Sequence, residues 1–379
     1  MRPPARDIRP LLVSIVFAAV LVPALALYYR PAGCTLEVWS SQEKSKLLGE
    51  MAVAYNSTST GRGCPVSVDV VASGTAEQAL ATGWQASGKP RPDVWTPAAS
   101  IWLDLLRASS PATSVAVPVT TPSLAHSPLV VAMPLPMATA VGWPDRQLGW
   151  ADLLNLERQD AFWTAAGHPE WGTFKLGQTD PTVSTSGLHA FIGMFSAAVE
   201  ARDKTNTPPP LTENDVSDPA VIAFVQAVES RVVHFTDTVA TFTNRLRAAG
   251  DLTYVSAVAM EEQEVWSYNA GNPRVRLAAI YPREGTLFAD HPYVVLVAGW
   301  VDARKRGAAA GFQQFLLSPN QQRSFQQHGF RDGNVPYPVP DDSVINAHNG
   351  LLARQPAVTL AEPSPAVLVK IEQAWPSVH

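Results

Sequence analysis

The hydrophobic positions between residues 174 and 199 change from a short extended run to a helical repeat. Residues 174–176 lean apolar, and Gly177 and Asp180-Pro181 then interrupt the run. Five apolar residues follow at the spacing i, i+3, i+4, i+7 and i+11: Leu188, Phe191, Ile192, Phe195 and Val199. This pattern predicts a strand, a turn and a helix with one buried face.

Three hydroxyl side chains, Ser184, Thr185 and Ser186, stand directly before this helical repeat. The first turn of a helix offers unpaired N–H groups and the positive end of the helix dipole, so the segment suits a ligand with negative charge or carbonyl oxygens. Ser and Thr are also the ordinary caps of any helix, and a capped helix without a ligand explains the same residues. The ligand interpretation gains weight because similar turns recur earlier in the chain.

Strand and helix patterns alternate between residues 35 and 106. The expected strands are 35–39, 65–71 and one ending within 92–97, and the expected helices carry Leu47, Met51 and Tyr55, then residues 76–84, then Ile101, Trp102, Leu105 and Leu106. This alternation predicts an α/β fold with a parallel sheet flanked by helices. In such a sheet, ligands bind where the strands deliver their C-terminal ends.

Small polar residues follow each of these expected strands. They are Ser40 and Ser41, then Ser73, Gly74 and Thr75, then residues 93–96. Small hydroxyls and a glycine leave room for a ligand to approach backbone amides. One serine after a strand is usually a turn residue, but three such turns in succession favour a binding edge.

The pattern after residue 127 is that of a second α/β region. The expected elements are a buried run at 127–133, a helix from 149, a surface linker at 205–210, a long helix carried by Val221, Phe224, Val225, Val228 and Val232, strands at 254–260, 274–281 and 293–299, helices at 312–317 and 321–325, and a wrapping tail with a short helix at 367–375. The strand at 254–260 leads directly into Glu261 and Glu262.

Residues 10–29 carry no charge and as a helix would span a bilayer core of about 30 Å. Three arginines precede them, which places the N-terminus in the cytoplasm and the remainder outside. Residues 24–26 offer a signal-peptidase site, whereas Tyr28 and Tyr29 favour an uncleaved anchor. We predict a single-pass protein of the cell membrane, or a secreted protein if the segment is cleaved.

The chain of 379 residues is 46% hydrophobic, which suffices for two compact domains. The net charge is −5 and there is no basic run, which argues against a nucleic-acid partner. The two cysteines, Cys34 and Cys64, stand at the starts of two expected strands. In an oxidising compartment this predicts a disulfide closing a loop of about 30 residues, with two free thiols as the alternative.

The residues give no pattern typical of catalysis. His168, His189 and His234 are isolated, and Ser186-Gly187 lacks the Gly-x-Ser-x-Gly elbow of hydrolases. The chain shows no metal-ligand spacing of His, Cys, Asp and Glu. We therefore expect a protein that is not an enzyme and has no cofactor or metal.

Six segments distributed along the chain carry a family resemblance: residues 40–44, 92–95, 175–188, 281–285, 290–293 and 315–331. They resemble bacterial extracellular solute-binding proteins with the type II periplasmic-binding-protein fold, in particular the membrane-attached kind found ahead of a von Willebrand factor A domain. The resemblance implies two lobes with a ligand cleft between them. It places residues 34–135 and 287–379, with the C-terminal tail, in the first lobe, 136–286 in the second, and a cytoplasmic stub with the anchor or signal in 1–33.

The resemblance also implies a site. One wall would hold Ser40, Ser41, Ser73, Gly74 and Thr75, and the other Ser184, Thr185, Ser186 and Glu261 or Glu262. The implied function is the capture of a small polar solute or oxyanion between the lobes. An ionised glutamate facing the cleft would repel an oxyanion and favour a cationic, hydroxylated or metal-bound solute. As an acid in the first turn of the following helix, the same glutamate would need no ligand.

The partners implied are a small polar ligand, the membrane through the N-terminal helix, and a von Willebrand factor A domain or a transporter permease. The alternative function is a cell-envelope interaction or sensing module that works with such a domain. In the family resembled, the segment near Trp375 leads into that domain, so we expect a fragment or a chain that lacks it.

Overall fold

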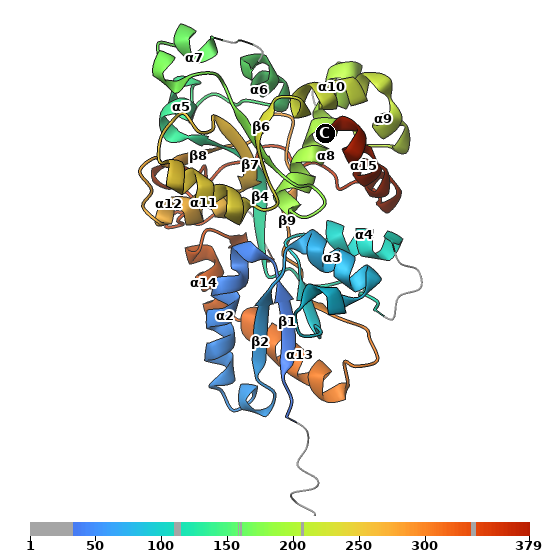
Figure 1. Ribbon diagram of the computed structural model, residues 1–379. Coiled ribbons are helices and arrows are strands. Elements are labelled where there is room, and N and C mark those ends of the chain that lie inside the picture. Colours follow the sequence, from blue (N-terminus) through green and yellow to red (C-terminus); the bar gives the residue numbers. More distant parts are fainter. Residues whose placement is uncertain (1–32, 110–114, 158, 160, 206–207, 335–338) are drawn as a thin grey trace, which may run out of the picture.

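The computed structural model describes residues 33–109, 115–157, 159, 161–205, 208–334 and 339–379. Figure 1 shows two lobes, one above the other, each with strands at its centre and helices around them. The predicted anchor or signal within residues 1–32 lies outside the described residues. In the described ranges, no helix is both long and apolar enough to cross a membrane.

The first lobe contains a four-stranded sheet in the order β10-β3-β1-β2. β1, β2 and β3 are parallel, and β10 joins β3 in antiparallel orientation. The strands are β1 (Leu36–Ser40), β2 (Val66–Val70), β3 (Val94–Thr96) and β10 (Val294–Val295). The helices are α2 (Gln42–Asn56), η1 (Gly61–Gly63), α3 (Ser73–Thr82), η2 (Trp84–Ser87), α4 (Ile101–Ser109), α13 (Ala303–Leu316) and α14 (Pro319–Gln327).

The second sheet has seven strands in the order β11-β4-β7-β5-β6, with β8 and β9 also paired to β4. β5 is parallel to both β6 and β7, whereas β4 is antiparallel to β7. The strands are β4 (Ala125–Pro134), β5 (Leu176–Thr179), β6 (Val232–Thr236), β7 (Ala257–Glu261), β8 (Leu277–Ile280), β9 (Phe288–Ala289) and β11 (Arg331–Asp332). The mixed α/β class predicted from the alternating pattern is therefore confirmed.

Helices surround the second sheet, and the last of them in the chain also contacts the first lobe. They are α5 (Leu135–Ala140), α6 (Trp150–Glu157), α7 (Phe162–Ala165), η3 (Pro169–Trp171), α8 (Thr185–Asp203), α9 (Glu213–Ser217), α10 (Pro219–Glu229), α11 (Val239–Ala249), α12 (Glu262–Ala270), η4 (Ala347–Asn349) and α15 (Pro365–Val378). The predicted helix after Ser186 is α8, and it is buried from Thr185 to Val199 rather than on one face only. The reason is that α6, α9, α10 and strands of the sheet surround it.

Cys34 and Cys64 form the predicted disulfide. The bridge joins the chain just before β1 to the chain just before β2, and these two strands are parallel neighbours. Because it closes a loop between residues 30 positions apart, the bridge contributes about 3–4 kcal/mol by restricting the unfolded chain.

The predicted long helix at 221–232 is shorter in the structure. α10 ends at Glu229, and Val232 begins β6, which pairs with β5 at Leu176. Val232 follows Val228 by four residues, so the helical repeat continues by coincidence into a β-branched run. Pairing with β5 decides the outcome, because it satisfies the backbone of this run and packs partly buried Val232 and Phe235 against the core, while Val233 is exposed.

The end of the chain contacts both lobes, whereas the sequence assigned 287–379 to the first. Ile345 and Leu351 join a core cluster with Val258 of the second sheet. α15 packs against α9 and α10 of the second lobe and also against α4 of the first (Figure 1). Its apolar face requires both surfaces for burial, so α15 bridges the lobes.

We predict that Trp375→Ala lowers the free energy of unfolding by about 3–5 kcal/mol. Trp375 is 8% exposed and its ring lies 5.3 Å from Phe191 of α8 and 5.9 Å from Phe235 of β6, so truncation leaves a cavity where α15 meets the second lobe. Urea unfolding provides the measurement. Lys370→Ala on the same helix removes only a solvent-exposed ion pair with Glu213 and should change stability by less than about 1 kcal/mol. Equal effects of the two substitutions would contradict the docking of α15.

Candidate functional site

The first turns of five helices meet at one small pocket between the lobes. α2 and α3 come from the first lobe, and α8, α11 and α12 from the second. Each of these helices directly follows a parallel strand, so the topology itself brings their N-termini to one place. The cavity is about 30 Å³, which holds a few water-sized groups. Its lining comprises Ser41, Gln42, Glu43, Ala72, Ser73, Val183, Ser184, Thr185, Ser186, Thr238, Val239, Glu261 and Glu264.

Many of the residues expected from the sequence reach this pocket. Those present are Ser41 and Ser73 on the first wall, and Ser184, Thr185, Ser186 and Glu261 on the second. Ser40, Gly74, Thr75 and Glu262 do not line it. Ser40 is buried and its hydroxyl donates to the Ser41 carbonyl at 3.1 Å, whereas Thr75 is exposed to solvent. The pocket therefore joins hydroxyl groups from both lobes, but only part of each expected turn contributes.

Gly74 contacts the other lobe instead of lining the pocket. Its N–H donates to the Val183 carbonyl at 3.1 Å. A Cβ atom at Gly74 would lie 2.0 Å from the Thr182 carbonyl oxygen, so this approach requires glycine. Beside it, Trp102 Nε1 of α4 donates to Thr185 Oγ1 at 2.8 Å. The two walls are thus in direct contact next to the pocket.

Glu262, which the sequence grouped with Glu261, has a different environment. Its wholly buried carboxylate accepts hydrogen bonds from Arg331 Nε and Nη2, both at 2.8 Å, and from the Tyr281 hydroxyl. A carboxylate paired in this way has its charge compensated inside the protein. The structure therefore places Glu262 in a buried ion pair, and only Glu261 reaches the pocket.

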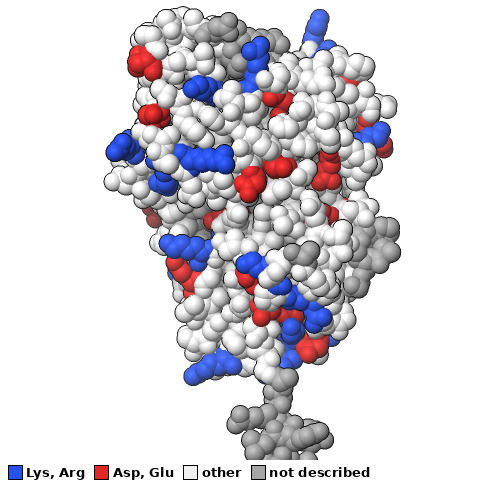
Figure 2. Space-filling model, in the orientation of Figure 1, with Lys and Arg blue, Asp and Glu red and all other residues white. Residues whose placement is uncertain are grey.

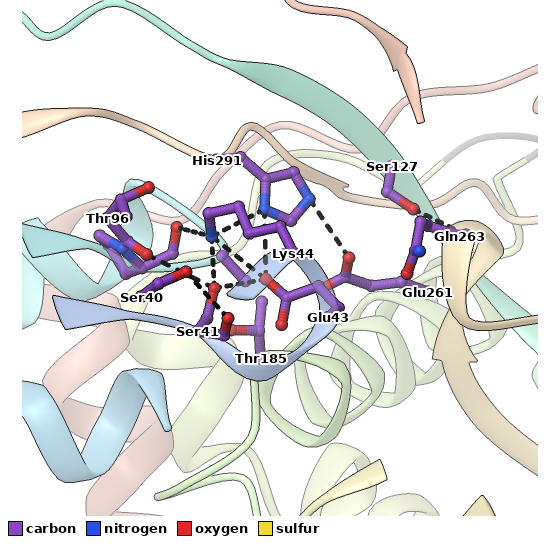
Figure 3. Close-up of polar contacts among 12 residues, drawn as sticks. Ser40, Ser41, Glu43, Lys44, Thr96, Ser127, Thr185, Glu261, Gln263 and His291 are labelled. Atoms are coloured by element: carbon purple, nitrogen blue, oxygen red, sulfur yellow. Dashed lines mark hydrogen bonds and ion pairs between the residues drawn. The ribbon is translucent and has the colours of Figure 1, made fainter. Parts of the chain in front are cut away.

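Lys44 of α2 lies behind the pocket and is completely buried. Its ammonium donates to Glu43 Oε1 at 3.2 Å, to the Pro97 carbonyl at 3.0 Å and to the Ser41 hydroxyl, and it lies 3.3 Å from His291 Nδ1 (Figure 3). No local pattern in the sequence indicates that Lys44 is buried. Its partners come from separate segments, and only the folded chain brings them together.

His291 connects this group to the second lobe. It lies in the segment between β9 and β10, where the chain passes from one sheet to the other. Its Nε2 is 3.3 Å from Glu261 Oε2, as Figure 3 shows. The backbone of His291 has φ 43°, a left-handed conformation that a non-glycine residue adopts only where its surroundings enforce it.

The charges in the first wall are balanced. Burial disfavours ionisation of Glu43, but Lys44 and His291 outweigh it and hold the pKa of Glu43 well below its usual range. Burial lowers the pKa of Lys44, and Glu43 opposes this shift. Burial and the Lys44 charge lower the pKa of His291 to about 4. At neutral pH the wall therefore holds an ion pair of Glu43 and Lys44 beside a neutral imidazole.

The second wall holds two carboxyl groups without a cation of their own in the pocket lining described here. Burial and the negative charge of Glu43 raise the pKa of Glu261 well above its ordinary value. The same causes raise the pKa of Glu264 to about 8. Glu264 Oε2 accepts a hydrogen bond from the Glu261 N–H at 3.0 Å and another from Ser186 Oγ at 3.2 Å. Glu264 therefore retains its proton near neutral pH, and the ionised form of Glu261 is disfavoured.

Sequence reasoning missed Glu43, Lys44, Thr238, Glu264 and His291. A signal existed for Glu264, because it stands three residues after Glu261, the spacing at which a first-turn acid reaches back to the helix start. Thr238 caps α11, which follows the unpredicted strand β6. Among the residues that the structure describes, no group of three or more His, Cys, Asp or Glu is placed to hold a metal ion.

The sequence model of the family described as bacterial extracellular solute-binding protein matches residues 36–331. A search of curated proteins gives no match. Solved structures do match: the sulfate-binding protein SubI of Mycobacterium tuberculosis H37Rv has 16% identity and a TM-score of 0.56, covering 91% of this chain and 99% of that one. A periplasmic thiamin binding protein has 15% identity and a TM-score of 0.58, covering 91% and 95%. Iron-bound HitA of Pseudomonas aeruginosa has 14% identity and a TM-score of 0.54, covering 91% and 98%.

We predict that Gly74→Ala separates the two walls. The added methyl group overlaps the Thr182 carbonyl, and overpacking of this kind destabilises the contact by about 1–3 kcal/mol. Small-angle X-ray scattering should give a larger radius of gyration than for the unmodified chain, with an unchanged far-UV circular dichroism spectrum. Gly49→Ala in α2 is the control, since nothing lies within 4 Å of a Cβ atom there. Identical scattering from all three proteins would contradict the prediction.

We predict that Glu264→Gln changes how stability depends on pH. Because the folded-state pKa of Glu264 is raised from 4.5 to about 8, its stabilising effect is complete at low pH and is lost as pH rises through this window. The lowered pKa values of His291 and His189 act oppositely, but only below about pH 6.5. Between pH 6.5 and 8, the unmodified chain should lose stability more steeply than Glu264→Gln, by up to about 1.4 kcal/mol per pH unit. Urea unfolding at several pH values tests this, and equal slopes would refute it.

Proposed function

Because the chain belongs to the bacterial extracellular solute-binding proteins, we propose that it captures a small polar solute in the pocket between its lobes, without catalysis. The observation that carries the proposal is that Ser41 and Ser73 of one wall face Ser184, Thr185 and Ser186 of the other across the same cavity. Hydroxyl groups and helix N-termini on two sides can satisfy several polar groups of a small molecule at once.

Binding and closure are coupled in this proposal. A solute that contacts both walls is bound more tightly when the walls are close together, so it shifts the chain toward the closed arrangement. The contacts of Gly74 with Val183 and of Trp102 with Thr185 define that arrangement. The names of the three structural neighbours refer to sulfate, thiamin and iron. The fold is thus compatible with different solutes, and the pocket residues select among them.

We further propose that the chain acts outside the cytoplasm and is attached to the membrane through residues 10–29. The uncharged run supports attachment, and the disulfide between Cys34 and Cys64 agrees with an oxidising compartment. A transporter permease or a von Willebrand factor A domain is the partner that the family resemblance favours. In the alternative function, an envelope interaction or sensing module, the pocket would take no solute.

A thermal-shift screen distinguishes these functions. We predict that at least one class among oxyanions, sugars, amino acids and metal ions raises the melting temperature of the unmodified chain. Ser186→Ala should weaken the affinity for that solute about threefold to tenfold, the usual effect of losing one hydrogen bond. Ser186 is 2% exposed and lines the pocket; its hydroxyl donates to Glu264, which leaves its oxygen to accept a hydrogen bond from the solute.

The matched control is Thr82→Ala, which removes an exposed hydroxyl at the far end of α3. It should leave the affinity unchanged. If no class of solute stabilises the chain, the proposal of solute capture is wrong and the interaction module is favoured.

A further inference from the structure

The positive helix ends around the pocket are already matched by carboxyl groups of the chain. Glu43 stands in the first turn of α2, Glu261 immediately precedes α12, and Glu264 lies in the first turn of α12. Helix N-termini that would otherwise favour a bound anion face these side chains instead. An oxyanion entering the pocket would meet the ionised carboxylate of Glu43, and it would further disfavour ionisation of Glu261 and Glu264.

The cationic side chains near the pocket do not offset its acidic groups. Lys44 is the closest ammonium behind the wall, and its bonds to Ser41, Glu43 and the Pro97 carbonyl commit it to the first lobe. The described lining of the inner cavity contains no Lys, Arg or His. On the face shown in Figure 2, acidic and basic side chains are interspersed and much of the surface has neither. The residues of the pocket, rather than a field of one sign over this face, therefore set its charge preference.

Glu261 has acceptor capacity that the protein does not use. Its side chain is 2% exposed, and Oε2 accepts no hydrogen bond from the described residues. His291 Nε2 lies 3.3 Å away but not in hydrogen-bond alignment. A buried carboxyl oxygen without a donor is unfavourable, and a ligand N–H group can supply that donor.

We propose that the pocket selects a small solute with a positively charged nitrogen group, and that Glu261 and Glu264 receive this group. The inference rests on the proposed function and specifies its ligand class. Ser186, which already donates to Glu264, fixes the orientation of that carboxyl group. Nitrogen cations suit the site because each N–H donor can pair with one of the carboxyl or hydroxyl oxygens that line both walls.

The remainder of the solute has space in an adjoining outer pocket of about 210 Å³. The two pockets share Gln42, Glu43, Val239 and Glu264, so Glu264 stands where they meet. The outer pocket is also lined by Lys46 and Arg247. A solute would therefore place its cationic end inward, near Glu261, and its uncharged or anionic end outward.

Capture of such a solute releases protons. Burial and Glu43 disfavour the ionised forms of Glu261 and Glu264, the pKa of Glu264 being about 8, and a cation at hydrogen-bond distance favours those ionised forms. The other charged or titratable groups around them are Glu43, Lys44 and Lys46 of α2, His291 of the β9–β10 connection, His189 of α8 and Arg247 of α11. Burial lowers the pKa values of His291 and His189 to about 4 and about 3, so neither imidazole charges above pH 6.

The test is isothermal titration calorimetry of the chain with ethanolamine, methylammonium and guanidinium as cationic probes, sulfate and molybdate as anionic probes, and glycerol as a neutral probe. We expect a cationic probe to bind, with an affinity that rises between pH 6 and 8 by up to about tenfold per pH unit for each proton released. Repeating the titration in two buffers of different ionisation enthalpy gives the number of protons released.

Glu264→Gln should lower the affinity for the cationic probe at least tenfold and reduce the proton release. Glutamine resembles the protonated acid, so this variant retains the shape of the pocket. Glu50→Gln is the control, because Glu50 is exposed on α2 away from the lining, and it should bind like the unmodified chain. Circular dichroism confirms that each variant is folded.

The possible failures are distinguishable. Binding of sulfate, molybdate or glycerol, unchanged in Glu264→Gln and without proton release, would overturn the cationic solute and leave solute capture intact. Binding of a cationic probe that Glu264→Gln does not weaken would overturn the role of this carboxyl group. If none of these probes binds, the inference is overturned, whereas the proposed function is decided separately by the thermal-shift screen with sugars, amino acids and metal ions.

Discussion

The buried ammonium of Lys44 is the interaction on which the site depends. It has no exposure to solvent, and it is held by Glu43, the Ser41 hydroxyl, the Pro97 carbonyl and His291. A charge in such a place is tolerated only when paired and hydrogen-bonded, because desolvation would otherwise destabilise the fold by several kcal/mol. The same ammonium favours the ionised form of Glu43, and this negative charge, together with burial, raises the pKa values of Glu261 and Glu264. One cation therefore sets the protonation of both walls.

Five helix N-termini at one pocket would ordinarily make an anion site. Here the chain supplies its own acids at those positions, and ionised Glu43 partly offsets the field of the helix ends before a solute enters. The result is a cavity whose hydroxyl groups include those of Ser41, Ser73 and Ser186 and whose titratable groups are carboxyls. The position of the site and the charge of its solute therefore have different origins. The fold places helix N-termini around a solute, whereas the side chains in the first turns of these helices determine which charge the solute carries.

Much of the fold could be predicted from the sequence, since strand and helix periodicity, the cysteines and the capping serines are local signals. The site was predictable where it depends on strand-to-helix turns, as at Ser41 and Ser184. It was not predictable at Lys44 and His291, whose burial depends on partners distant in the sequence. The sequence also could not predict that Glu261 and Glu262 have different environments. The two residues are consecutive at the junction of β7 and α12, and consecutive side chains there point in different directions. The prediction of a helix that extends to Val232 was wrong for a related reason, because strand pairing between β6 and β5 outweighed the helical spacing of Val228 and Val232.

The contacts between the two walls favour the closed arrangement of the lobes, whereas the charges within the walls oppose it. Gly74 with Val183 and Trp102 with Thr185 stabilise the closed arrangement without involving a solute. Closure also buries Glu261 and Glu264 close to ionised Glu43, which is unfavourable whenever the two acids lose their protons. A solute that compensates these carboxylates gains most in the closed arrangement, because only there do both walls surround it. Differential affinity of this kind is what a ligand needs in order to shift a conformational equilibrium. The carboxyl groups thus link the identity of the solute to the closure of the lobes.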